Sequence, residues 1–144
     1  IDKKLSGLKW STVYFEDKEK EKNIIINNLN FFKRLDNSIK FILVSDYQIY
    51  NPILNKKDYS PVKYWFINHT YPDKNHTLRG DFDSFFKNKI LSNNISLIIF
   101  DNTAEFKDKD LINFNWLYKC SSKKIDDSIP GNLKVFEIDT NCIE

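Results

Sequence analysis

Two continuous apolar runs constrain the fold of this chain more than any other feature of its sequence. Residues 39–44 read IKFILV and residues 95–100 read ISLIIF, so a single polar residue interrupts each run. Short runs without apolar/polar alternation are typical of strands buried on both faces, as in parallel sheets covered by helices. We therefore expect both runs to be strands in the interior of such a sheet.

An amphipathic segment precedes each run. Residues 16–36 begin with the charged stretch EDKEKEK and continue with apolar residues three and four positions apart, and residues 78–92 repeat an apolar residue at every fourth position. These spacings place the apolar side chains on one face of a helix. Helices alternating with buried strands predict an α/β domain. The apolar positions are Ile25, Leu29 and Phe32 in the first segment, and Phe82, Phe86 and Ile90 in the second.

The remaining segments complete this prediction. We expect a short strand within residues 5–15, a third helix over residues 108–119 and a last strand over residues 133–138, at or near a sheet edge. Residues 51–77 predict a long ordered loop with a short strand at residues 62–67. The whole chain is then one soluble, three-layer, Rossmann-like α/β domain, with a mostly parallel sheet and helices on both faces.

Composition excludes several classes of function. The net charge is only +2 and lysines alternate with acidic residues, so we expect no nucleic-acid partner. The three glycines do not form a phosphate-binding loop, so we expect no nucleotide and no other cofactor. The chain starts with Ile1, contains no methionine and has no apolar run near the roughly 18 residues of a membrane span. We expect it to be a piece of a longer protein.

Polar residues follow both apolar runs directly. In open α/β sheets, ligands bind beyond the carboxyl ends of the strands. If the two strands are neighbours, Asp46 and Asp101 approach each other and could hold a metal or act as acid and base. The alternative is that each aspartate caps a turn. The residues that reach this edge are Ser45, Asp46, Tyr47 and Gln48, and Asp101, Asn102 and Thr103.

Histidines and cysteines add no catalytic or metal-binding motif. His69 and His76 lie in the long loop without a supporting acidic motif, and we interpret them as structural. Cys120 and Cys142 are not spaced as a close metal-ligand pair, so a zinc site is not predicted. Both cysteines could stay reduced, or they could pair in an oxidising compartment.

Several short stretches resemble one protein family when they are taken in order. Together they resemble the C-terminal extracytoplasmic domain of bacterial polytopic membrane proteins similar to GT-C superfamily glycosyltransferases, which use polyprenyl-phosphate sugars. The stretches are LSGLKW (5–10), SDYQIYNPIL (45–54), SPVKYW (60–65), TYP (70–72), FFKNKI (85–90) with NI (94–95), and the late cysteines Cys120 and Cys142.

The resemblance implies an accessory role outside the cytoplasm. In such a protein the catalytic acidic residue belongs to the membrane region, so no catalytic residue carries over to this chain. Its partners would be its own transmembrane region and a glycan or polyprenyl-phosphate sugar. An extracytoplasmic location also implies that Cys120 and Cys142 form a disulfide.

Aromatic residues around the long loop are the candidate sugar contacts. Tyr47, Tyr50, Tyr64 and Trp65 offer faces suited to sugar rings, although the same residues could instead fill the core beneath the loop. A rival hypothesis is a stand-alone, metal-assisted enzyme that uses Asp46 and Asp101. A third is a structural or partner-docking module.

Overall fold

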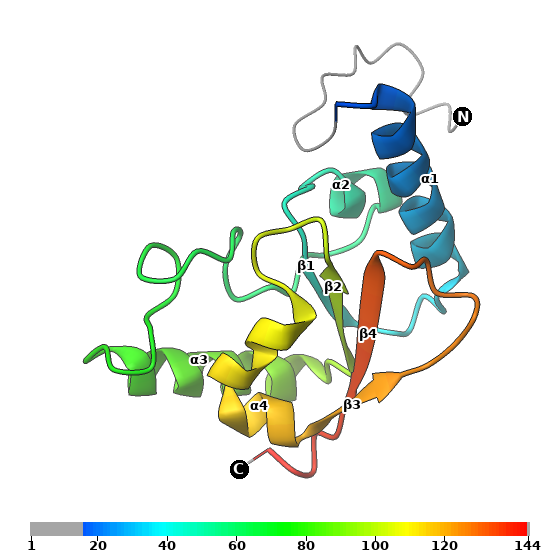
Figure 1. Ribbon diagram of the computed structural model, residues 1–144. Coiled ribbons are helices and arrows are strands. Elements are labelled where there is room, and N and C mark those ends of the chain that lie inside the picture. The colour runs from blue at the N-terminus through cyan, green and yellow to red at the C-terminus, as the bar shows by residue number, and fades with distance from the viewer. Residues whose placement is uncertain (1–15, 144) are drawn as a thin grey trace.

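A four-stranded mixed sheet lies at the centre of the computed structural model, which describes residues 16–143 (Figure 1). Its strand order is β1-β2-β4-β3. The strand expected within residues 5–15 lies outside the described residues. The four strands are β1 (Phe41–Val44), β2 (Leu97–Asp101), β3 (Ser121–Lys124) and β4 (Leu133–Ile138).

Only one pair of strands in this sheet is parallel, so the prediction of a mostly parallel, Rossmann-like sheet is wrong. β1 pairs with β2 in parallel, whereas β4 is antiparallel to both β2 and β3. It follows that β1, β2 and β3 run in the same direction and that β4 lies between β2 and β3 in the opposite one. The apolar runs predict burial on both faces, which this sheet has, but burial does not specify the direction of a neighbouring strand.

Strand β3 has no counterpart among the predictions. Its sequence is SSKK, and its residues are half-buried or exposed. It pairs with β4 from Ser121 opposite Ile138 to Lys124 opposite Val135. Its place in the sheet depends on backbone hydrogen bonds to β4, which leave no apolar pattern in the sequence. As a result β4, predicted to lie at or near an edge, has a neighbour on each side.

The first predicted helix forms as α1 (Lys18–Arg34). The Asp17 carboxylate accepts hydrogen bonds from the amides of Glu19 (3.0 Å) and Lys20 (3.1 Å), which satisfies free donors of the first turn. Lys33 and Arg34 occupy the last turn, where positive charge suits the helix dipole.

Helix α3 (Arg79–Asn93) confirms the second predicted helix. It ends at Asn94, whose φ of 52° is left-handed and tolerated by asparagine. The predicted third helix is instead two short pieces, the 3₁₀ helix η2 (Asp108–Asn113) and α4 (Asn115–Lys119). Phe114 separates them with non-helical backbone angles, and its side chain is fully buried.

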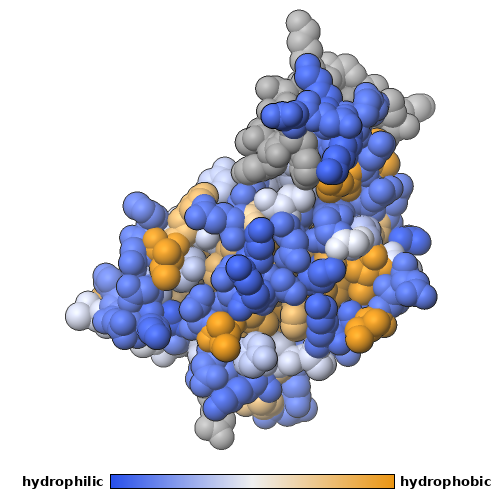
Figure 2. Space-filling view, viewed as in Figure 1, coloured by the Kyte–Doolittle hydropathy of each residue, from blue (hydrophilic) through white to orange (hydrophobic). Residues whose placement is uncertain are grey.

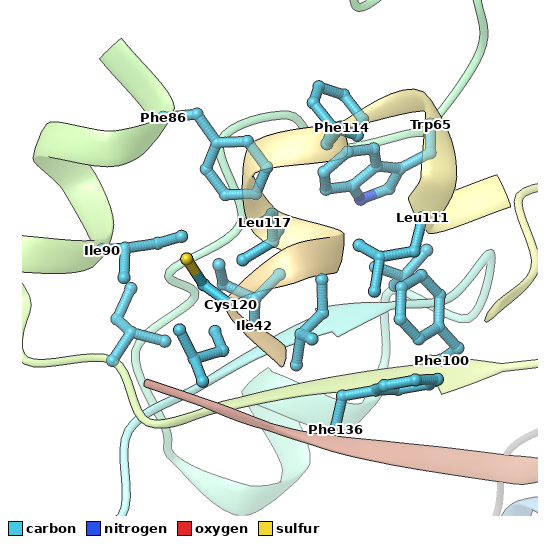
Figure 3. Packing of buried hydrophobic residues seen from close by; sticks show 14 of the residues in the cluster. Ile42, Trp65, Phe86, Ile90, Phe100, Leu111, Phe114, Leu117, Cys120 and Phe136 are labelled. Atoms are coloured by element: carbon cyan, nitrogen blue, oxygen red, sulfur yellow. The ribbon is translucent and has the colours of Figure 1, made fainter. Parts of the chain in front are cut away.

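Helices cover both faces of the sheet. On one face, α1 and the short helix α2 (Tyr50–Leu54) pack through Ile25, Leu29, Phe32 and Tyr50. On the other face, α3, η2 and α4 pack over a second cluster that contains Phe86, Ile90, Leu111 and Leu117 (Figure 3). Strand residues alternate between the two faces, as the pleat requires.

Trp65 joins the long loop to the second cluster. Its ring centroid lies 5.1 to 5.9 Å from four other rings, those of Tyr71, Phe86, Phe106 and Phe114. The predicted order of this segment is therefore confirmed, but the loop is shorter than predicted, because its first residues belong to α2 (Tyr50–Leu54). The strand predicted at residues 62–67 does not form, and only an isolated bridge joins Ile67 to Tyr71.

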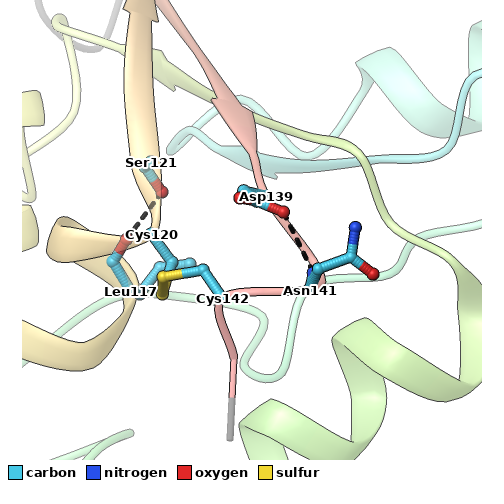
Figure 4. The surroundings of a disulfide bond; sticks show 6 residues. All are labelled: Leu117, Cys120, Ser121, Asp139, Asn141 and Cys142. Atoms are coloured by element: carbon cyan, nitrogen blue, oxygen red, sulfur yellow. Dashed lines mark hydrogen bonds between the residues drawn. A yellow bond between two sulfur atoms is a disulfide. The ribbon is translucent and has the colours of Figure 1, made fainter.

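A disulfide joins Cys120, at the end of α4, to Cys142, near the C-terminus (Figure 4). Their Cα atoms are 5.5 Å apart across a separation of 22 residues, and no free cysteine remains among the described residues. The amide of Asp139 donates to the Cys120 carbonyl (2.8 Å), which holds the end of β4 against the same turn. The pairing implied by the resemblance is confirmed.

Replacing both Cys120 and Cys142 by serine should destabilise the domain by about 3 kcal/mol, because the crosslink restricts a loop of 22 residues in the unfolded chain. Urea denaturation of the oxidised protein, the reduced protein and the double variant measures this difference. The reduced protein is expected to unfold at the same urea concentration as the variant. Two reactive thiols in the unfolded, unreduced protein would contradict the pairing.

Candidate functional site

The carboxyl ends of β1 and β2 meet at one sheet edge, as predicted. The register pairs Val44 with Phe100, so Ser45 lies beside Asp101, and Asp101 in turn pairs with Leu133 of β4. A buried polar cluster forms there around Asp101, and we call it the Asp101 cluster. Its members are Asn28, Ser45, Tyr50, Asp101, Thr103 and Asn132.

Both oxygens of the fully buried Asp101 carboxylate accept hydrogen bonds. Oδ1 accepts from the Thr103 hydroxyl (2.8 Å) and amide (3.2 Å), and from Asn132 Nδ2 (3.0 Å). Oδ2 accepts from Ser45 Oγ (3.2 Å) and Asn28 Nδ2 (3.4 Å). These donors replace the water that the carboxylate loses on burial. The carboxylate thus connects α1, β1 and the turn before β4.

Tyr50 closes the cluster on the side of α2. Its hydroxyl accepts a hydrogen bond from Asn28 Nδ2 (2.9 Å). Burial, with the Asp101 carboxylate as a second cause, strongly raises the pKa of the Tyr50 phenol, which keeps it protonated. Asn28 Oδ1 is buried without a hydrogen-bond partner among the described residues. The cluster is therefore an interior network in which nearly every buried polar side-chain atom is hydrogen-bonded.

The other predicted residues at this edge are spread out. Asp46 is half-buried and forms no hydrogen bond or ion pair with any described residue. Gln48 Nε2 donates to the carbonyls of Ser45 (2.9 Å) and Lys63 (2.8 Å), and so joins the strand end to the long loop. Asn102 exchanges two weak hydrogen bonds with Asp108. Within residues 16–143 no group of three or more His, Cys, Asp or Glu side chains could hold a metal ion.

Three of the four aromatic candidates are core residues. Tyr47, Tyr50 and Trp65 are buried, and Tyr47 donates its hydroxyl hydrogen bond to Glu21 (2.7 Å). Only Tyr64 presents a partly open ring, with 38% of the residue exposed. A sugar can therefore reach Tyr64 without rearrangement of the core, but not the faces of the other three.

A second candidate site lies between the long loop and the start of α3. This hollow of about 400 Å³ has an aromatic wall and a polar rim, and we call it the aromatic hollow. Phe85 is 50% exposed beside it, and Leu78 is also exposed. Its aromatic wall consists of Tyr71, Phe82 and Phe85, and its rim includes Asn68, His69, His76 and Asp81.

Local hydrogen bonds shape the hollow before any ligand binds. Asn68 adopts a left-handed φ of 59°, and its side chain exchanges two 3.1 Å hydrogen bonds with Asp73. The Asn75 amide, followed by the Asn68 side chain, holds the pKa of Asp73 below its usual range. His76 Nδ1 accepts from the Leu78 amide (3.1 Å). These turns fix the rim at the first turn of α3.

Arg79 joins the segments next to the hollow. The guanidinium is buried, donates to Asp83 Oδ1 (2.9 Å) and to the Pro72 carbonyl (3.2 Å), and also bonds the Asn113 carbonyl. Its Cζ lies 4.3 Å from the ring centroid of Phe114. The cation therefore joins the loop, α3 and η2 in one rigid unit.

Sequence reasoning missed Asn28, Asn132 and the aromatic hollow. Asn28 is three residues after Ile25 and lies within the apolar face of α1, and a polar residue in such a stripe indicates a buried partner. Asn132 follows a Pro-Gly pair and reads as part of a turn. The hollow has no sequence signal, because its two walls are a loop and a helix that meet only in the fold.

No protein-family model, curated protein or solved structure matches this chain. None of the helices within the described residues is both long enough and apolar enough to cross a membrane.

Asp101→Asn should destabilise the fold by about 3 kcal/mol, because asparagine places an N–H among donors that need an acceptor. Chemical denaturation measures the loss. Asp46→Asn is the matched control and should change stability by no more than about 0.5 kcal/mol, since Asp46 has no described partner. Equal effects of the two changes would contradict this assignment.

The Tyr71 phenol should ionise at a higher pH than an ordinary tyrosine. Burial, with the Asp110 carboxylate as the next cause, raises the pKa of Tyr71 from 10.0 to about 12. The unfolded chain releases this proton more readily, so Tyr71 stabilises the fold fully below pH 10.0, and this contribution is lost as the pH rises towards about 12. The difference between phenolate absorbance titrations of the native protein and of Tyr71→Phe isolates this group. A difference curve centred near the ordinary tyrosine pKa would contradict it.

Proposed function

We propose that this chain is a non-catalytic, extracytoplasmic accessory domain of a membrane glycosyltransferase, and that it positions the acceptor or sugar through the aromatic hollow. The observation that carries the proposal is the hollow itself, where Phe85 is half exposed and its ring centroid lies 6.4 Å from that of Phe82. Aromatic faces bind the apolar face of a sugar ring, and a polar rim bonds its hydroxyls. Tyr64, which does not line the hollow, is a second partly exposed aromatic residue of the long loop.

The chemistry of the rim fits a neutral or weakly charged glycan. His69 and His76 offer ring nitrogens, Asn68 an amide and Asp81 a carboxylate. His76 Nδ1 is taken by the Leu78 amide, which leaves Nε2 as the nitrogen that can meet a ligand. Such mixed donors and acceptors match the hydroxyl groups of a sugar.

Two further observations support the location and the accessory role. The Cys120–Cys142 disulfide is typical of proteins outside the cytoplasm. Asp101 lies at the carboxyl end of β2, where a catalytic acid would be expected. Both of its carboxylate oxygens already accept hydrogen bonds from neutral side chains. The ordered resemblance to the extracytoplasmic domain of GT-C-like proteins supplies the class of parent protein, its lipid-linked sugar donor and its bacterial membrane.

On the side shown in Figure 2, the surface favours a small-ligand site rather than a broad docking face. Hydrophobic residues there lie in separate patches on a mainly hydrophilic surface. Broad docking faces present larger continuous apolar patches.

Oligosaccharides of hexoses, N-acetylhexosamines and uronic acids should bind the native domain weakly but saturably. Phe85→Ala should lower the affinity for the sugar about fivefold, because one stacking face is lost. Isothermal titration and amide chemical shifts of residues 68–85 measure binding.

Tyr118→Ala is the matched control, because Tyr118 on α4 is also 50% exposed and does not line the hollow. It should leave sugar binding unchanged. Absence of saturable binding by the whole panel, or equal effects of Phe85→Ala and Tyr118→Ala, would refute the proposed sugar contact.

A further inference from the structure

A second hollow, of about 430 Å³, lies beside β1, an edge strand of the described sheet, and we call it the basic hollow. Its volume is in the range of small-molecule sites. Of the described residues that line it, none is acidic. Its polar lining consists of Lys40, Lys56, Lys57, Asn37, Asn55 and Tyr59.

Lys56 is the decisive residue of the basic hollow. Its ammonium nitrogen is buried and has no hydrogen-bond partner among the described residues. Its contact with the Phe41 ring, at 5.5 Å from the centroid, does not replace the hydrogen bonds it loses to desolvation. An ammonium group in this state has three donors and no acceptor to receive them.

Asp36, whose charge interacts with that of Lys56, does not neutralise it. Asp36 Oδ1 accepts from the Ser38 hydroxyl (2.6 Å) and amide (2.7 Å), and the two residues Asp36 and Lys56 form no ion pair. Ser38 is the main reason that the pKa of Asp36 lies below its usual value, and Lys56 is a smaller one. The attraction between the two charges therefore acts at a distance, through partly solvated space.

Two more lysines line the hollow without an acidic partner. Lys57 lies 5.3 Å from the ring centroid of Tyr59, and neither Lys57 nor Lys40 forms an ion pair with a described residue. By contrast, Lys22, Lys123 and Lys124 each pair with a carboxylate. Three like charges around one hollow repel each other, and a bound anion removes this repulsion.

The backbone presents Lys56 in a fixed position. Asn55 ends α2 with a left-handed φ of 52°, and the amides of Asn55 and Lys56 donate to carbonyls of that helix, 3.2 Å to Pro52 and 3.0 Å to Asn51. Because the turn is closed by these bonds, the lysine approaches the hollow from a rigid helix end.

We propose that the basic hollow binds the phosphate or pyrophosphate group of a phosphorylated ligand. Lysine ammonium groups bind phosphate oxygens as compact charges, and the amides of Asn37 and Asn55 can donate to the same oxygens. Phe41, Leu54 and Tyr59 offer apolar surface to the organic part of the ligand. This site is separate from the aromatic hollow and does not depend on the function proposed above.

Pyrophosphate is the first probe. Titration of the native domain should produce saturable amide shifts in residues 37–41 and 54–59. Lys56→Met keeps the aliphatic stem and should weaken pyrophosphate binding at least about tenfold, as expected for loss of a charge-assisted hydrogen bond. Lys74→Met is the matched control, because Lys74 is exposed, lies outside the hollow and forms no ion pair with a described residue, and it should change affinity less than about twofold.

Thermal unfolding separates binding from folding. Without ligand, Lys56→Met should melt at the same or a higher temperature than the native protein, because it removes a buried unpaired cation. With pyrophosphate, the native protein should gain stability and the variant should not. Lys40→Met changes a second lysine of the lining and should also weaken pyrophosphate binding.

Vesicles identify the source of the phosphate. If the native protein sediments with phosphatidylcholine vesicles that contain phosphatidic acid, and Lys56→Met does not, the site binds a lipid headgroup. A pyrophosphate response without vesicle binding would assign it to a soluble phosphorylated ligand. No saturable response to either probe, or an equal loss in Lys74→Met, would overturn the proposal.

Discussion

The buried Asp101 carboxylate is the interaction on which the arrangement of the elements depends. It accepts hydrogen bonds from side chains of α1, the end of β1, its own turn and the residue before β4. A charge in the interior is stable only when such donors surround it. The position of each donor is therefore constrained, and with it the mutual position of α1, β1, β2 and β4.

This role changes the meaning of the strand-end motif. An acid at the carboxyl end of a strand is a common feature of catalytic sites, because it faces the crevice where ligands bind. Here the crevice is filled by Asn28, Tyr50 and Asn132, and the acid supports the fold. The exposed chemistry lies elsewhere, in the aromatic hollow beside α3 and in the basic hollow beside β1.

The same reasoning applies to the aromatic residues. Trp65 and Tyr71 hold the long loop on the core, so most of the loop's aromatic content serves packing. What remains for the proposed sugar contact is the rim of that packing, where Phe85 and Tyr64 are partly exposed. A loop held in this way has its side chains ordered without a ligand, and such preorganisation lowers the entropic cost of binding.

The sequence by itself determined the local elements. Its apolar periods predicted β1, β2, β4, α1 and α3 to within a few residues, since burial of one face or both faces imposes a period on the chain. Only the tertiary structure decided the antiparallel insertion of β4, the polar strand β3, the split at Phe114, and which aromatic rings and charges are buried. These depend on contacts between segments distant in sequence. The spacing of apolar residues indicates which face of an element is buried, but not which partner a given side chain meets.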